Sequence, residues 1–294
     1  MKRLIVTADD FGLTAKINQG IIEAHRQGII TSTSLLANGV AFDDAVTLLR
    51  ETPSLGVGVH LNLTEGSPLL PGREVPSLVD HDGVFRFGPG TLARRIVTGK
   101  VRLAEIEKEL RAQIERVLGA NLPLTHLDGH KHIQLLPPVL DVTIRLAVEY
   151  RIKAIRCAVE RLSAPVSLWR RNRSVPSGVM KQFLRGRLAA LLALAQRRRL
   201  DRAQLKSPEH FYGVAQTGFL DRISLRQIIA NLPEGTSELM CHPGYVDGQL
   251  RQTPTRLLAQ REEELAVLVE PETRQLVADN CVQLINYRQL GEQP

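Results

Sequence analysis

Aspartate and histidine gather in four short stretches of this sequence. Asp9 and Asp10 follow an apolar run at the N-terminus, His60 lies in a second apolar run, and His242 ends a late one. The fourth stretch, THLDGHKH at 125–132, holds His126, Asp128, His130 and His132. Carboxylate and imidazole groups together suit a divalent metal ion. Three protein ligands would leave coordination positions for water and substrate, and the ion would lower the pKa of the bound water.

Each group also has a purely structural interpretation. Adjacent aspartates favour turns and helix N-caps, a single histidine in an apolar strand is usually a hydrogen-bonded core residue, and His242 with Pro243 and Gly244 fits a turn. The stretch 125–132 indicates more. In an extended chain its four titratable side chains share one face, where burial is costly unless they are paired or bound to metal. Neighbouring side chains diverge, so one of Asp9 and Asp10 can bind metal while the other faces the attacking water.

Short apolar runs alternate with amphipathic patterns, and these elements must position the chemical groups. We expect strands at 3–8, 29–37, 55–63, 124–130, 153–158, 238–242 and 281–285. Helices are expected from Ile17 to Gly28 and at 41–49, 103–118, 139–150, 225–232 and 255–269, with a long loop at 64–90. This alternation predicts a parallel α/β sheet. No glycine-rich phosphate loop follows the first strand, which favours a (β/α) barrel-like fold, closed, distorted or incomplete, in a single domain. In a barrel the strand ends share one rim.

Composition excludes several classes of protein. The chain has 294 residues, 43% of them hydrophobic, and three widely spaced cysteines, Cys157, Cys241 and Cys281. An odd number of scattered cysteines makes no disulfide framework and favours a reducing compartment. The N-terminus, MKRLIVTADDFG, does not resemble a signal peptide, and no run approaches the roughly 20 apolar residues of a membrane span. These observations predict a cytoplasmic protein.

Positive charge is concentrated in one segment. Residues 151–206 hold 15 Lys and Arg against 2 Asp and Glu, whereas the remainder of the chain has a net charge of −6. This asymmetry predicts either an anionic contact, with nucleic acid or a membrane surface, or a solvated helical insertion at about 160–206. Aromatic content of only 4% argues against nucleic acid, because stacking platforms are scarce.

Part of the basic segment has the pattern of an amphipathic helix. Over 179–200 an apolar stripe follows helical spacing, and basic residues stand at both ends: Phe183, Leu184, Leu188, Leu191, Leu192 and Ala195, with Lys181, Arg185 and Arg197–Arg199. One interpretation is a helix that rests on an anionic membrane surface. The alternative is that the stripe packs against the barrel or a partner subunit.

Five motifs together resemble the YdjC-type carbohydrate deacetylases, the family of chitooligosaccharide deacetylase. They are TADDFG at 7–12, TSTSLLANG at 31–39, GVGVHLNLT at 56–64, THLDGHKH at 125–132 and CHPGY at 241–245. The resemblance implies a single barrel-like domain over residues 1–294, one divalent metal ion, Mg²⁺ or Zn²⁺, and removal of an acetyl group from an N-acetylated amino sugar. By motif position, the implied metal ligands are Asp10, His60 and His130, the base is Asp9 and the acid is His242.

Two further stretches are similar, more loosely, to the hopanoid-biosynthesis-associated branch of that family. They are REVPSLVDHDGVFR at 73–86 and EHFYGVAQTGF at 209–219. This second resemblance implies a lipid-linked amino sugar as substrate and a peripheral position at the inner membrane surface. Asp128 and His132 are left as groups that support the metal ligands or contact the substrate.

Two other functions fit parts of the pattern. Two histidines and one carboxylate also form the triad of non-heme iron oxygenases, although those enzymes usually have jelly-roll folds. A basic nucleic-acid-binding protein would account for the charge of residues 151–206, and a salt-dependent affinity for DNA would reveal it.

Overall fold

A parallel sheet curled into a half-barrel forms the centre of the molecule. The computed structural model describes residues 1–158 and 196–292. The sheet has the order β4-β3-β2-β1-β6-β5, with β7 beside the first half of β1, and every strand pair is parallel. The strands are β1 Lys2–Phe11, β2 Ser32–Leu35, β3 Gly56–Leu61, β4 Leu124–Gly129, β5 His210–Tyr212, β6 Gly235–Cys241 and β7 Val282–Leu284. The predicted barrel-like α/β fold is therefore confirmed.

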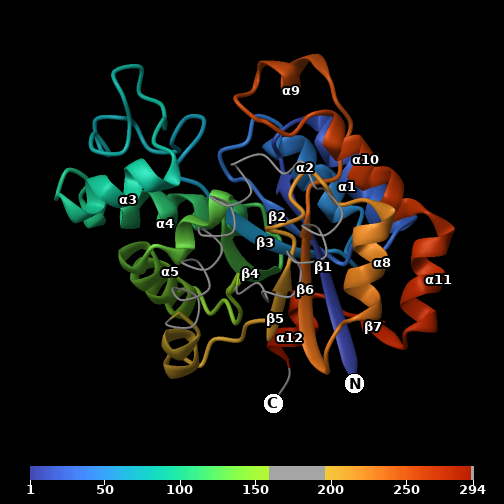
Figure 1. Cartoon of the computed structure of the whole chain (residues 1–294). Helices are drawn as coiled ribbons and strands as arrows, with labels where there is room; N and C mark the ends of the chain where they lie inside the picture. The colour runs from blue at the N-terminus through green and yellow to red at the C-terminus, as the bar shows by residue number, and fades with distance from the viewer. Residues whose placement is uncertain (159–195, 293–294) are drawn as a thin grey trace, which may run out of the picture.

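Helices surround this sheet (Figure 1). They are α1 Ala15–Arg26, α2 Phe42–Arg50, α3 Pro89–Val97, α4 Leu103–Gly119, η1 His130–Leu135, α5 Pro137–Glu149, α8 Arg222–Ala230, α9 Gly248–Gln252, α10 Ala259–Val269, α11 Pro271–Asp279 and α12 Tyr287–Gly291. In Figure 1, α4 and α5 lie on one flank and α1, α8, α10 and α11 on the other, and both chain termini lie at the end opposite α9. Within the described residues, no helix is long and apolar enough to cross a membrane.

Local sequence explains where these elements begin. Thr14 caps α1 by accepting a hydrogen bond from the backbone N–H of Ile17, and the apolar positions of this helix are buried against the sheet. All eight residues from Leu4 to Phe11 in β1 are buried, as expected for a central parallel strand covered on both faces. That burial includes Asp9 and Asp10, so two carboxylates lie inside the protein.

Three predicted elements differ from the structure. The strand expected at 153–158 is reduced to single bridges, Leu127 with Ile155 and Ala154 with Lys206, because this stretch lies beside β4 only briefly before turning away. The long loop expected at 64–90 ends in the start of α3, where Pro89 suits the first helical position. The helix expected at 255–269 begins later, at Ala259. Short β5 was not predicted.

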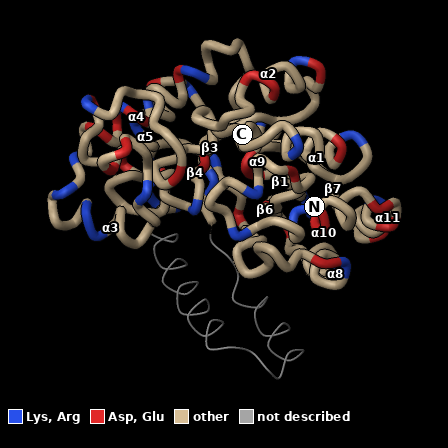
Figure 2. Tube along the Cα trace, turned by 90° about the horizontal axis from the view of Figure 1, so that it is seen from above, with Lys and Arg blue, Asp and Glu red and all other residues tan. Residues whose placement is uncertain are grey.

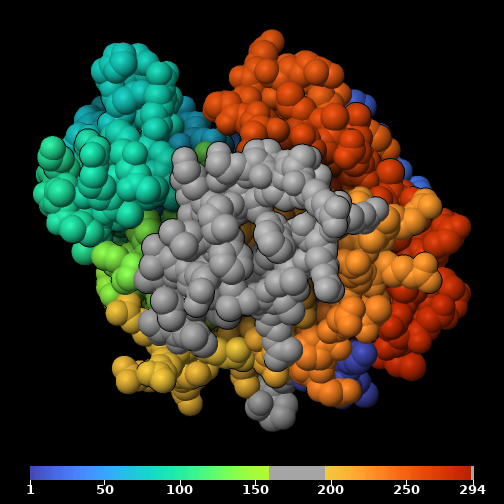
Figure 3. Space-filling model, in the orientation of Figure 1, coloured from blue at the N-terminus to red at the C-terminus, as the bar shows by residue number. Residues whose placement is uncertain are grey.

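The basic segment lies largely outside the described residues. Both the expected insertion at 160–206 and the expected amphipathic helix at 179–200 include residues 159–195, and of this region the structure describes only the end, where 196–202 are helical. In the described residues, basic and acidic residues are interspersed along the outer helices (Figure 2). In Figure 3, the loop after β3 with α3, and the region of α9, form two separate projections at the upper edge of the molecule.

Candidate metal centre and active site

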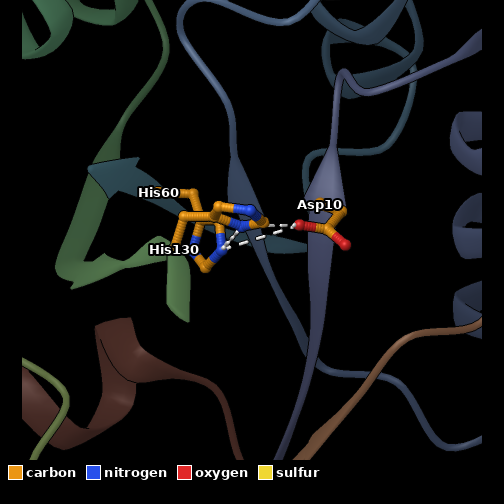
Figure 4. A group of neighbouring side chains, drawn as sticks. All are labelled: Asp10, His60 and His130. Carbon is orange, nitrogen blue, oxygen red and sulfur yellow. Dashed lines mark hydrogen bonds and ion pairs between the residues drawn. The ribbon is translucent and has the colours of Figure 1, made fainter. Parts of the chain in front are cut away.

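Asp10, His60 and His130 converge at the carboxyl ends of the strands. Asp10 lies near the end of β1, His60 lies in β3, and His130 follows β4 (Figure 4). The Oδ1 atom of Asp10 lies 3.1 Å from Nδ1 of His130 and 3.7 Å from Nε2 of His60, and the two nitrogens are 3.3 Å apart. Three ligands about 2.1 Å from one ion lie roughly 3.0 to 3.4 Å apart at octahedral or tetrahedral angles. Two of the three separations lie in this range, and the third, between His60 and Asp10 at 3.7 Å, is slightly longer, so the three atoms are close to the spacing of a divalent metal site.

His60 is held in the orientation that such a site needs. Its Nδ1–H donates to Oδ1 of Asp128 at 2.8 Å, which leaves the Nε2 lone pair facing Asp10 and His130. Asp128 is itself fixed, because its Oδ2 accepts from Ser34 Oγ at 2.5 Å and pairs with Arg156 at 2.7 Å. Although burial opposes ionisation, Arg156 and His60 lower the pKa of Asp128. The carboxylate therefore remains charged and orients the imidazole.

His130 has a second carboxylate behind it. Its Nε2 lies 3.0 Å from Oε2 of Glu65, and Lys131 pairs with the other oxygen of that glutamate. When the Nε2–H of His130 donates to Glu65, the lone pair of Nδ1 is free to face Asp10 and His60. Burial alone would lower the pKa of His130, but the contacts with Asp10 and Glu65 raise it to about 9. A proton therefore competes with a metal ion for this nitrogen, and metal affinity falls as the pH is lowered.

Asp10 completes the group with an oxygen that lacks a hydrogen bond in the described residues. Its Oδ2 accepts from Arg261 of α10 at 2.6 Å, whereas the buried Oδ1 has no hydrogen-bond partner there. Burial opposes ionisation, but Arg261 and His130 hold the pKa of Asp10 well below its usual range. A buried, ionised oxygen aimed at two imidazole nitrogens is costly unless a cation binds there, so the residues fit a metal ion.

Asp9 belongs to a different hydrogen-bond network from its neighbour Asp10, although both approach Nε2 of His60. Both of its oxygens accept from the fully buried Arg156, each at 2.8 Å, and Arg156 also pairs with Glu238 of β6 at 3.0 Å. Oδ2 of Asp9 lies 4.0 Å from Nε2 of His60. Asp9, His60 and Asp128 also lie close enough to hold an ion. Arg156 already neutralises both of these aspartates, so the group with Asp10 is the better metal site.

His242 follows β6 and is positioned by α10. Its backbone N–H donates to Glu264 at 2.6 Å, and Glu264 also accepts from the backbone of Gly218. The imidazole Nδ1 is buried and has no hydrogen-bond partner among the described residues. Burial lowers the pKa of His242 to about 4, so the ring is neutral at pH 7. To act as an acid it must therefore take up a proton during the reaction.

Comparison with known proteins agrees with the sequence motifs. The model of the YdjC-like protein family matches residues 3–279. The chain belongs to the YdjC-like protein family. A carbohydrate deacetylase of Brevibacillus brevis is 36% identical over 293 residues, which cover 98% of this chain and 100% of the relative. A carbohydrate deacetylase of Geobacillus stearothermophilus is 35% identical, with 97% of this chain and 96% of the relative covered.

A solved structure shares the fold of this YdjC-like chain along its whole length. It is a protein of Enterococcus faecalis to which cleavage of cellobiose phosphate has been ascribed, with a TM-score of 0.77 and 27% identity. The match covers 98% of each chain. The half-barrel and its covering helices are therefore a shared architecture rather than a peculiarity of one sequence.

Several residues of the YdjC-like site were not predicted. Four of them anchor a predicted group directly, and Glu238 acts through Arg156: Glu65, Arg156, Arg261 and Glu264, with Glu238. A charged residue inside an apolar run was the available signal for Arg156 and Glu238, since such residues are seldom buried without a partner. One expectation was wrong. The four titratable side chains of 125–132 do not share one extended face, because β4 ends at Gly129 and His130 and His132 lie in the turn that follows. The ring of His126 stacks on Tyr287 of α12, with 3.8 Å between ring centroids.

Replacing Asp128 with asparagine is expected to weaken metal binding about 10- to 100-fold, because such supporting carboxylates fix the tautomer and basicity of a histidine ligand. A chelator competition titration measures the dissociation constant. Ser34→Ala is the matched control, since it removes one hydrogen bond to Asp128 and keeps the carboxylate; its effect should be smaller. If Asp128→Asn lowered the melting temperature but left metal affinity unchanged, Asp128 would serve only the fold.

Replacing Glu264 with glutamine is expected to remove a pH dependence of stability. Burial raises the pKa of Glu264 from 4.5 to about 7, despite the opposing charge of Arg261. Between these values the folded protein binds more protons than the unfolded chain, so the free energy of unfolding falls as pH rises through this window. Glutamine keeps an acceptor oxygen and has no charge. Relative to wild type, the variant should gain on the order of 1–3 kcal/mol between pH 4.5 and 8.

Denaturant unfolding at several pH values measures this gain. The difference between the two proteins isolates Glu264 from other titrating groups, including His242 and His130. An equal difference in stability at pH 4.5 and pH 8 would contradict the assignment.

Proposed function

We propose that this protein is a metal-dependent N-deacetylase that hydrolyses the acetamido group of an N-acetylated amino sugar. The observation that carries the proposal is the metal spacing of Asp10, His60 and His130, with the carboxylate of Asp9 beside it. Relatives named carbohydrate deacetylases, which match nearly the whole chain, support the same reaction class.

The residues suit amide hydrolysis. A divalent ion, when bound, polarises the acetyl carbonyl and lowers the pKa of a bound water. Asp9 takes a proton from the water while the oxygen of the water bonds to the carbonyl carbon. The carbon–nitrogen bond then breaks as the proton taken from the water passes from Asp9, by way of His242, to the leaving amine, and acetate is released. Arg156 keeps Asp9 in place throughout, because two parallel hydrogen bonds fix the plane of the carboxylate.

The two other functions are supported less well. Two histidines and one carboxylate also suit non-heme iron, but this chain forms a parallel α/β half-barrel and its relatives are named deacetylases. For nucleic acid, the described surface offers interspersed charge rather than one basic face (Figure 2).

A lipid-linked amino sugar is the finer form of the proposed substrate. It rests on the looser sequence resemblance of residues 73–86 and 209–219 to the hopanoid-associated branch. In that form the protein would work in the cytoplasm at an anionic membrane surface, as a single domain with a basic insertion at about 160–206. Co-sedimentation with anionic vesicles that weakens with salt would support this arrangement.

Acetate release from a panel of substrates tests the proposal. The panel contains N-acetylglucosamine oligosaccharides and an N-acetylated glycolipid, each incubated with metal-loaded protein and with protein treated with chelator. We expect release that requires metal, and the preferred substrate decides between free and lipid-linked sugars. Absence of acetate from every substrate, or release that is unaffected by full metal removal, would reject the proposal.

A further inference from the structure

His132 has a strained backbone in a turn beside the metal centre. Lys131 and His132 are consecutive residues with φ of 53° and 56°. These angles lie in the left-handed region, which residues other than glycine rarely adopt. Left-handed backbone costs free energy at each such residue, and strain of this kind clusters at functional sites. The turn brings the side chain of His132 back toward the strand ends.

His132 follows β4 in the chain, and its ring reaches across to β5. It meets Phe211 edge to face, with ring centroids 6.0 Å apart, and Phe211 is fully buried with the guanidinium of Arg156 5.7 Å from its ring centroid. His132 shares a turn with the metal ligand His130, and Phe211, which it contacts, lies beside the arginine that holds the proposed base Asp9. His132 is therefore a close neighbour of the candidate active site.

The imidazole also has an unused polar atom. Its Nδ1 is buried and forms no hydrogen bond with the described residues, although the ring as a whole is partly exposed. Buried polar atoms of this kind are uncommon, and each needs an explanation such as a ligand. Nδ1 of His242 is in the same condition. His242 acts as the acid in the proposed mechanism, whereas His132 has no role in the proton transfers.

We propose that His132 is a substrate-binding residue whose Nδ1 forms a hydrogen bond with a hydroxyl of the amino sugar. A hydroxyl both donates and accepts, so it satisfies either tautomer of the ring. The sugar would then be held by His132 while its acetamido group lies at Asp10, His60 and His130. This inference rests on the proposed deacetylase function. It gives the strained turn at Lys131 and His132 a role in placing a substrate-binding side chain.

Two variants separate binding from packing. His132→Phe keeps a ring against Phe211 and removes the nitrogen, while His132→Asn relaxes the backbone, because asparagine tolerates the left-handed region. For deacetylation of a β-linked N-acetylglucosamine disaccharide, both variants should raise KM about 10-fold, the usual effect of losing one hydrogen bond to a ligand. We expect kcat to stay within about threefold of the wild-type value, because a residue that only binds substrate changes KM rather than kcat. Bound metal, measured by elemental analysis, should be unchanged, and His132→Asn should melt no lower than wild type.

Each other outcome would overturn the inference. An unchanged KM in His132→Phe would make the ring a packing element, and so would a marked loss of stability in His132→Asn with normal KM. A fall in kcat of about 100-fold at unchanged KM would place His132 at the reacting atoms instead. His81→Asn, at a side chain 85% exposed, is the matched control and should behave as wild type. Wild-type protein that deacetylates no N-acetylated sugar would reject the proposed function itself, and this assignment with it.

Discussion

Replacing His60 with alanine is expected to abolish metal binding and, with it, deacetylation. His60 offers one of the two nitrogens of the group, 3.3 Å from the ligand atom of His130 and 3.7 Å from that of Asp10. Removing one of three protein ligands leaves two, which hold a divalent ion poorly. Elemental analysis of the purified variant measures occupancy, and acetate release measures activity.

A second cluster provides the control for this experiment. Asp80, His81 and Asp82 also lie close enough to hold an ion, but they are largely exposed, and Arg86 pairs with both aspartates. His81→Ala should therefore leave occupancy and activity unchanged. Full metal occupancy in His60→Ala, or its loss in His81→Ala, would show that the metal centre has been misassigned. The fold of His60→Ala is checked by circular dichroism, because His60 also pairs with Asp128.

Replacing Asp9 with asparagine should lower turnover about 10²- to 10⁴-fold while the metal stays bound, the usual effect of removing a general base. Asparagine has nearly the same shape and can still accept a hydrogen bond from Arg156, so the main loss is the ability to take a proton. Turnover is measured at saturating metal and substrate, with metal occupancy determined on the same sample.

Glu238→Gln is the matched control for Asp9→Asn. It also removes a carboxylate charge from Arg156, at 3.0 Å, but the other partners of Glu238 are the hydroxyls of Thr7 and Tyr287 rather than the metal ligands. Its effect on turnover should be much smaller. If Asp9→Asn retained nearly full activity, the base would be another carboxylate, and Asp128 would be the next residue to test.

The sequence could predict the site because parallel strands bring their carboxyl ends to one edge. Asp9, Asp10, His60 and His242 all stand at or near strand ends, so recognising the strands was enough to expect their proximity. Local geometry also predicted that Asp9 and Asp10 would have different partners. In the structure each accepts hydrogen bonds from a different arginine, Arg156 for Asp9 and Arg261 for Asp10.

The anchoring residues could not be predicted in the same way. Arg261 lies 251 positions from Asp10 along the chain, and nothing in a helical pattern marks one arginine as a partner for a distant carboxylate. The left-handed turn at Lys131 and His132 was hidden as well, since neither residue is glycine or asparagine, the usual signals of such backbone. For the same reason the extended face assumed for residues 126–132 ends at Gly129.

The weakly bonded side of the half-barrel has a consequence for how this architecture can diversify. Between β4 and Lys206, which precedes β5, the described chain is joined through two isolated bridges, whereas the other strands are joined by continuous ladders. A change in the length or sequence of the connection across this seam would disturb few main-chain hydrogen bonds, and lengthening a loop adds little entropic cost. The sheet can therefore change along this side while the strands that carry Asp9, Asp10 and His60 keep their ladders.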